Sequence, residues 1–198
     1  MFWRLRHFIF SYKAPMIYLK LLADRPTWPQ PPNTDCLSIH RIESMDDAFE
    51  KRLRDALNAL DFAAPFTCAD ARTRIARGEL FLVANHGHEI AGWAWYASHR
   101  VHCADVGCHV QLREGHAYAY NVYVSRAHRG HGLATRLLTE ADALLAARGV
   151  SSVWAMIHDW NVASRTAFSR AGYKPIGRCR ALTLFGLKYR RFPGAIQG

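Results

Sequence analysis

The stretch from Asn121 to Leu138 constrains the fold most, because an apolar strand, expected over 118–124, runs through a basic glycine-rich turn directly into a helix. In such a unit the turn and the start of the helix direct unpaired backbone N–H groups toward one place. Gly130 and Gly132 let the backbone come close to a ligand without an intervening side chain. Arg129 adds positive charge, and so the stretch predicts an anion-binding site.

The spacing of this turn separates it from the common nucleotide-binding loops. Residues 129–134 read Arg-Gly-His-Gly-Leu-Ala, which matches neither G-x-x-x-x-G-K-[ST] nor G-x-G-x-x-G. The loops of ATPases and dinucleotide-dependent dehydrogenases are therefore poor fits. The helix that follows is predicted from apolar residues at helical spacing and ends before Gly149. Its apolar face comprises Leu133, Leu137, Leu138, Ala141, Leu144 and Leu145.

The turn resembles the pyrophosphate loop of the GNAT superfamily of acyl-CoA N-acyltransferases, whose pattern is Arg/Gln-x-x-Gly-x-Gly/Ala after a strand ending in Val. A later stretch resembles a second motif of that family, Asn-x-x-Ala-x-x-x-Tyr-x-x-x-Gly-Phe. The matching residues are Asn161, Ser164, Phe168, Gly172 and Tyr173. The two motifs have the family's order and separation, and the resemblance extends over residues 37–190. The alternative, a generic βαβ turn, would require both motifs to coincide.

The element order agrees with this resemblance. The pattern predicts strands at 37–42, 80–85, 90–98, 118–124, 152–158, 173–178 and 181–189, and helices at 48–60, 68–77, 133–148 and 161–171. Ser44 is expected to cap the first of these helices. We expect an α/β fold with a single-domain, GNAT-like mixed central sheet of about seven strands flanked by about four helices.

The resemblance implies an N-acetyltransferase that uses acetyl-CoA as cosubstrate. The enzyme would transfer an acetyl or other short acyl group to an unidentified amine acceptor, by direct attack in a ternary complex. The backbone N–H of Val122 would face the acyl carbonyl, and Val124 would pair with the pantetheine arm. The implied cofactor-binding residues also include Arg129, Gly130, His131, Gly132, Leu133, Ala134, Asn161, Arg165 and Phe168.

The catalytic acid and base are less clear from the residues. Phe168 occupies the position of the family's usual tyrosine acid and has no proton to donate. Met156 occupies a position where some members of the family carry a catalytic Glu. His158 shares a strand face with Met156, and histidine is a residue type that commonly acts as a general base, so we predict His158 as the base. His116 is the competing candidate, and a purely structural role at a strand end remains an alternative for His158.

Residues 1–23 are basic, aromatic and apolar, and Pro15 is expected to divide them into two short helices. They have the composition of an interfacial helix, which would give peripheral membrane contact. The favoured alternative is that they pack on the chain's own core or on a second subunit in a homodimer. Residues 24–36 are expected to form a proline-rich linker, 37–190 the acyltransferase domain, and 191–198 a C-terminal tail.

Charge and cysteine content restrict the surroundings of the protein. The net charge of +10 and the pI of about 9.7 indicate an anionic partner, such as a CoA ester, a nucleic acid or an acidic membrane. No nucleic-acid partner is expected, because no recognition motif for one is present. The five cysteines favour a reducing compartment. We therefore expect a cytoplasmic protein, with membrane association left open.

Residues 99–116 hold donors that could bind a metal: His102, Cys103, Cys108, His109 and His116. Their spacing is not that of a common zinc site, so no metal is expected and a surface loop is the favoured interpretation. Two functions remain as alternatives to acyl transfer. One is a catalytically silent acyl-CoA-binding protein, suggested by Phe168, and the other is a membrane-docked scaffold.

Overall fold

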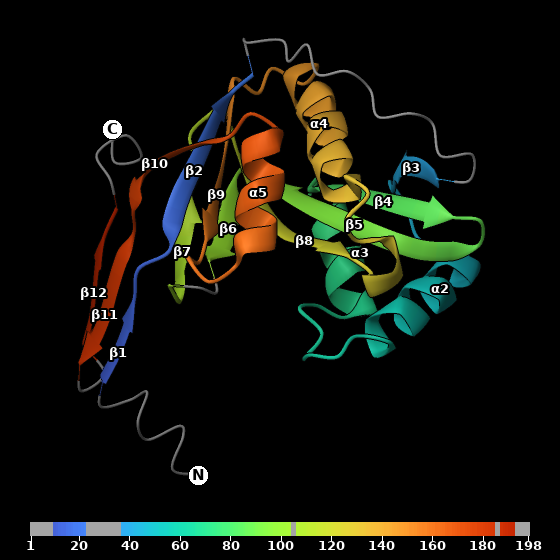
Figure 1. The fold of residues 1–198 in the computed structure, drawn as a ribbon, viewed down its shortest axis with the longest axis horizontal. Helices are drawn as coiled ribbons and strands as arrows, with labels where there is room; N and C mark the ends of the chain where they lie inside the picture. The colour runs from blue at the N-terminus through green and yellow to red at the C-terminus, as the bar shows by residue number, and fades with distance from the viewer. Residues whose placement is uncertain (1–9, 23–36, 104–105, 185–186, 193–198) are drawn as a thin grey trace.

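The computed structural model describes residues 10–22, 37–103, 106–184 and 187–192 (Figure 1). The strands are β1 (Phe10–Lys13), β2 (Met16–Leu21), β3 (Leu37–Arg41), β4 (Leu80–His86), β5 (Glu89–Ala97), β6 (Arg100–Cys103), β7 (Cys108–Gln111), β8 (His116–Val124), β9 (Ser152–Ile157), β10 (Lys174–Arg178), β11 (Arg180–Leu184) and β12 (Leu187–Arg191). The helices are α2 (Asp47–Asn58), α3 (Cys68–Ala76), the short 3-10 helix η1 (Arg126–His128), α4 (Leu133–Ala146) and α5 (Val162–Arg170).

A seven-stranded sheet forms the centre of the molecule, in the order β10-β2-β9-β8-β5-β4-β3. Its neighbours are antiparallel except β8 and β9, which are parallel. β6 and β7 form a separate hairpin, and β1, β11 and β12 form a small three-stranded sheet that projects from one side (Figure 1). The mixed α/β fold with a seven-stranded sheet is the fold that the sequence predicts.

Helices cover both faces of the sheet. On one face α4 and α5 pack through Leu137, Leu138 and Phe168 against the inner strands. On the other face α2 packs through Phe49 and Leu53 against the aromatic residues of β4 and β5. Each helix is amphipathic, and burial of its apolar stripe against the sheet supplies most of its stability.

The helices expected in the N-terminal segment are wrong from Phe10 onward, because this part of the chain forms β1 and β2. β2 lies between β9 and β10 in the main sheet, and Ile17 is fully buried there. The basic residues that made the segment resemble an interfacial helix include Lys20, whose charge is neutralised inside the protein by Asp142. Residues 1–9, which hold Phe2, Trp3 and Phe8, and the linker, residues 24–36, lie outside the described residues, so the membrane and packing alternatives for this part stay untested.

Three further differences are local. Asp46, rather than Ser44, caps α2, with its carboxylate accepting from the backbone N–H of Phe49. The loop expected over 99–116 is largely the β6–β7 hairpin. The last predicted strand, 181–189, is two antiparallel strands, β11 and β12, because the apolar run folds back on itself and pairs with its own continuation.

Candidate functional site

The parallel strands β8 and β9 separate along their length. They pair from His116 and Ser152 only as far as Tyr118 and Trp154, although β8 continues to Val124. Beyond Tyr118, the side of β8 that faces β9 therefore has no strand partner among the described residues. Apart from the carbonyl of Val124, which accepts from Arg129, its backbone N–H and C=O groups are available to an extended ligand lying between the strands.

A β-bulge changes the direction of the side chains of β8 at this position. Tyr120 pairs with Trp95 and Tyr123 with Trp93, so that Asn121 and Val122 together lie opposite one residue of β5. Asn121 has a φ of 49°, the left-handed conformation that Asn adopts more readily than most residues. After the bulge Val122 packs toward the α4 face of the sheet, while Tyr120 and Tyr123 lie toward the α2–α3 face.

The glycine-rich loop joins β8 to α4 in an open conformation. Gly130 and Gly132 have φ values of 85° and 76°, and a Cβ built on either would meet no atom within 4 Å. Gly132 is the N-cap of α4, and no side chain caps this helix. The first N–H groups of α4 are therefore open to an external anion, which the positive end of the helix dipole would attract.

The other predicted loop residues divide into two groups. His131 is exposed beside the glycines, whereas Leu133 is buried in the core and Ala134 packs against it. Arg129 is not directed into the loop, because its Nε donates to the carbonyl of Val124 at 3.0 Å and its guanidinium lies 5.9 Å from the ring centroid of Tyr123. Arg129 therefore fastens the loop to the end of β8.

The second motif lies on and beside α5. Asn161 is the N-cap of this helix and accepts a hydrogen bond from the N–H of Ser164 at 3.1 Å. Arg165 donates to the hydroxyl of Tyr18 and to the carbonyl of Asp159, which ties α5 to β2. Phe168 is buried and lies edge-on to another buried ring, so it packs in the core.

The two histidines predicted as bases lie at opposite ends of the parallel strands. His158 follows β9 and stacks on the exposed ring of Trp160, near the end where the strands have separated. The Nδ1 of His116 lies 2.9 Å from the hydroxyl of Ser152, where the strands are still paired. At ~3.3 Å per residue, His116 is roughly 20 Å along β8 from Val122.

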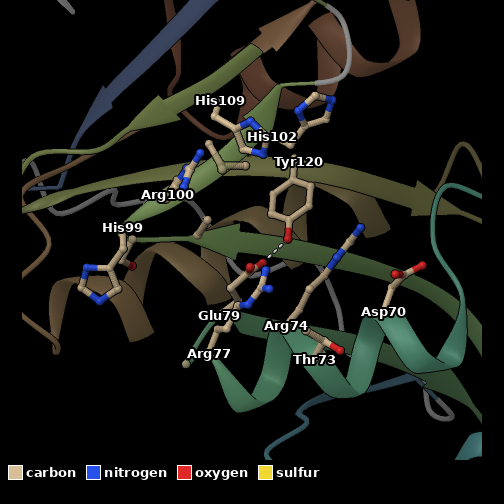
Figure 2. A pocket seen from close by; sticks show the side chains of 14 residues that line it. Asp70, Thr73, Arg74, Arg77, Glu79, His99, Arg100, His102, His109 and Tyr120 are labelled. Carbon is tan, nitrogen blue, oxygen red and sulfur yellow. Dashed lines mark hydrogen bonds between the residues drawn. The ribbon is translucent and has the colours of Figure 1, made fainter. Parts of the chain in front are cut away.

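A cavity of about 680 Å³ opens on the α3 side of the sheet (Figure 2). Its walls come from α3, the turn after α3, the end of β5, the β6–β7 hairpin and Tyr120. Because Tyr120 is two residues before Val122, the cavity borders the stretch of β8 that has left β9. The walls of this cavity thus include α3 and the hairpin of the 99–116 region.

Glu79 and Tyr120 form the central contact of the cavity. The Tyr120 hydroxyl donates to the Glu79 carboxylate, as Figure 2 shows. Burial raises the pKa of Glu79, although Tyr120 and the nearby Arg74 partly oppose this effect. The pKa of Tyr120 is also raised, mainly by burial, so its hydroxyl keeps its proton at physiological pH. The pair thus offers a carboxylate that binds a proton more tightly than an exposed glutamate does.

Arg74 lies beside this pair in an aromatic setting. Its guanidinium carbon is 5.2 to 5.3 Å from the ring centroids of Phe66, Trp95 and Tyr120. Its Nη1 is buried and has no hydrogen-bond partner among the described residues. The sequence analysis missed both Arg74 and Glu79. The available signal was a single carboxylate between the helix-ending Gly78 and an apolar strand, which does not show what it faces.

The predicted metal donors come together only partly. The rings of His102 and His109 are 4.7 Å apart across the hairpin, and Cys103 pairs with Cys108 in the same register. Within the described part of the chain, no group of three or more such donors has a geometry that could hold a metal ion. The same residues include no helix that is both long and apolar enough to cross a membrane.

Comparisons with known proteins agree with this arrangement. A search of curated protein sequences finds no match. Among solved structures, similar ones include a Drosophila protein (12% identity, TM-score 0.62, covering 92% of this chain and 55% of that one) and a GCN5-related N-acetyltransferase from Sphaerobacter thermophilus (19%, 0.57, 98% and 56%). A third is the ribosomal-protein-S18-alanine N-acetyltransferase from Escherichia coli (17%, 0.51, 70% and 77%).

These likenesses concern the fold, and the chain spans little more than half the length of the first two structures. A sequence model of one family, however, matches residues 42–173, which include the bulged strand, the glycine-rich loop and α5. The match covers more than half of the chain, and therefore the chain belongs to the acetyltransferase (GNAT) family.

Proposed function

We propose that this protein transfers an acetyl or other short acyl group from acyl-CoA to an amine, by direct attack in a ternary complex. The observation that carries the proposal is the separation of β8 from β9 directly before the uncapped start of α4. An acyl-CoA has an extended pantetheine arm and a pyrophosphate. The gap between β8 and β9 suits the extended arm, and the uncapped start of α4 suits the pyrophosphate.

The residues present fit such a ligand. The loop around Gly130 and Gly132 leaves open space where a Cβ would stand, and the start of α4 offers N–H groups to the pyrophosphate. The unpaired edge of β8 offers Val124 to the pantetheine arm and the N–H of Val122 to the acyl carbonyl. An N–H held at that carbonyl would stabilise the negative charge that develops on its oxygen when the amine attacks.

The acceptor amine would approach from the α3 side, through the cavity around Tyr120. An amine must lose a proton to attack, and the carboxylate of Glu79 is positioned in this cavity to accept one directly or through water. His158 remains the alternative base that the sequence predicts. The thiol of CoA has a pKa of about 8.5 if it behaves like a free Cys thiol, so its thiolate is a fair leaving group without protonation. The lack of an acidic proton on Phe168 therefore does not prevent turnover.

The proposal also covers where the protein is located and whether it assembles with other copies or with a membrane. We place the protein in the cytoplasm, where the described cysteines, which form no disulfide, would stay reduced. Apart from Phe168, no feature of the described residues favours a silent acyl-CoA-binding protein, and none favours a membrane-docked scaffold. Homodimer formation and membrane contact through the first residues stay predictions from the sequence.

The direct test is a screen of amines with acetyl-CoA as donor. The panel should contain small amines, amino acids, amino sugars, aminoglycosides and peptide N-termini, with thiol release and product mass as separate readouts. We expect acetylated product from at least one class, in step with thiol release. Tight acetyl-CoA binding without product from any class would contradict the proposal and favour the silent binding protein.

A further inference from the structure

The charge of the α3-side cavity is unbalanced. Three arginines line it, Arg74, Arg77 and Arg100, against two carboxylates, Asp70 and Glu79. The lining also includes His99, His102 and His109, which add nitrogen donors and acceptors without adding negative charge.

Both carboxylates of the cavity already have partners. Asp70 accepts from the backbone N–H and the hydroxyl of Thr67, at 2.8 and 2.9 Å, in the capping box of α3. Glu79 accepts from Tyr120. Among the described residues neither carboxylate forms an ion pair with an arginine of the cavity. Arg74 and Arg77 act on these carboxylates only at a distance, and none of the three guanidinium groups has a carboxylate in direct contact among the described residues.

Arg74 is the least exposed of these cations. Three aromatic rings surround its guanidinium and hold it in place, and its buried Nη1 lacks an acceptor. Leaving a buried guanidinium N–H unpaired is costly, because its interaction with water is lost and nothing replaces it. A ligand oxygen with negative charge would supply the missing partner, and Arg is the side chain best suited to bind a carboxylate or phosphate.

The cavity also sets the size and direction of such a ligand. A volume of about 680 Å³ suits a small molecule rather than a folded protein surface. Figure 2 shows Glu79 and Arg74 beside Tyr120, with His102 and His109 from the hairpin beyond the ring. An amine directed at Glu79 would therefore have the anion-binding side chains within the reach of a short molecule.

We propose that the preferred acceptor is a small amine that also carries an anionic group, a carboxylate or a phosphate, which Arg74 and Arg100 bind while the amine faces Glu79. This inference rests on the proposed acyl transfer and specifies its acceptor. It predicts that selectivity depends on the charge of the acceptor and resides in the arginines of the cavity.

The test uses pairs of acceptors that differ only in the anionic group. β-Alanine is compared with β-alaninamide, and phosphoethanolamine with ethanolamine, with acetyl-CoA in excess. A charge-assisted hydrogen bond contributes roughly 1.5–3 kcal/mol, so we expect kcat/KM for the anionic member of at least one pair to be higher by ~10-fold or more. The pair that shows the preference distinguishes carboxylate from phosphate.

Three variants locate the effect. Arg100→Gln, at an exposed position, and Arg74→Gln should each reduce the ratio of kcat/KM between the anionic and the neutral member several-fold. Arg113→Gln removes the same charge from an exposed position outside the cavity and should retain the full preference. If Arg74→Gln fails to fold, Arg100→Gln alone decides.

Two results would overturn the inference: equal kcat/KM within both pairs, or a preference that survives undiminished in Arg100→Gln. In either case neutral amines would still be acetylated, and the proposed function would stand. Failure of the proposed function looks different, because then neither the anionic nor the neutral amines, nor any class in the wider panel, would be acetylated.

Discussion

The ammonium of Lys20 lies 2.7 Å from the carboxylate of Asp142, and both side chains are almost completely shielded from water, with 5% and 3% of their surface exposed. The pair joins β2 to α4, and the hydroxyl of Tyr173 donates to the second oxygen of Asp142 at 2.6 Å. Burial raises the pKa of Asp142, and Lys20 opposes that rise. The helix that begins at the glycine-rich loop is thereby anchored to an N-terminal strand by two buried charges.

Removal of Lys20 should destabilise the fold strongly. In Lys20→Met the carboxylate of Asp142 keeps its place but loses its counter-charge, so we expect the free energy of unfolding to fall by about 3–5 kcal/mol. The double variant Lys20→Met/Asp142→Asn is the matched control. It removes the stranded charge and keeps an acceptor for Tyr173, and should recover most of the loss. Urea denaturation measures both, and equal stability of the two variants would show that the ion pair does not hold β2 in place.

The bulge at Asn121 should be needed for activity. Val at this position would have to adopt a left-handed conformation that costs about 1–2 kcal/mol, and the strand would instead tend to become regular and turn Val122 away. We expect Asn121→Val to lower kcat/KM for acetyl-CoA by at least ~10-fold. Asn121→Gly tolerates the positive φ and should stay within a few-fold of the wild type. Similar losses in both variants would indicate that the amide side chain matters, rather than the backbone.

The glycine-rich loop should be the site of acyl-CoA binding. Gly132→Val adds a side chain and backbone strain where the pyrophosphate is expected, so calorimetry should show no measurable acetyl-CoA binding. Gly149→Val is the control at the other end of α4. Its φ of 81° is similar and its Cβ would also meet no atom within 4 Å, but it is remote from the loop. Loss of affinity in both variants would point to strain in α4, and unchanged affinity in Gly132→Val would contradict the site.

Glu79 and His158 can be separated as bases by the pH dependence of the rate. Because the pKa of Glu79 is raised above its ordinary 4.5, activity that needs its ionised form should rise with pH through a midpoint above that value. Glu79→Gln should lower kcat by ~10²-fold or more and remove this acidic limb, with acetyl-CoA affinity unchanged. If His158 is the base instead, His158→Ala will show these effects and Glu79→Gln will not.

The stability of the protein should respond to Glu79 in the opposite direction. A carboxyl whose pKa is higher in the folded state binds its proton more tightly there, so its contribution to stability is complete below pH 4.5 and is lost as the pH rises through the folded value. The stability of the wild type relative to Glu79→Gln should therefore decrease over the same range in which activity increases. A constant difference would mean that burial does not perturb this carboxyl.

Prediction from the sequence succeeded where the determining residues are neighbours in the chain. The run from β8 through Gly130 and Gly132 into α4 is visible because a strand, a turn and a helix each leave a local pattern. Prediction failed for Lys20, because a charged side chain is expected to be exposed unless its partner is known, and this partner is 122 positions away. The bulge at Asn121 was missed for a similar reason, since it is defined only by the register against β5.

In the candidate site, too, the features set by neighbouring residues were predictable and those set by distant residues were not. The loop and the cap at Asn161 follow from local motifs, whereas the contact between Glu79 and Tyr120 joins the turn after α3 to β8, across 41 positions of the chain. The orientation of Arg129 toward Val124 was also beyond prediction, because an arginine near an anion site is equally able to bind the backbone.

The position of β2 has a consequence for how the protein folds. Residues 16–21 pair with 152–157 on one side and with 174–178 on the other. This early segment of the chain can therefore form its strand pairs only after two segments near the end of the chain have been synthesised. Contacts of such long sequence separation slow folding, because a large loop must close before any of them forms. During synthesis on the ribosome, β9 and β10 would each expose an unpaired edge until β2 inserts between them, and that interval is when the chain is most prone to aggregate.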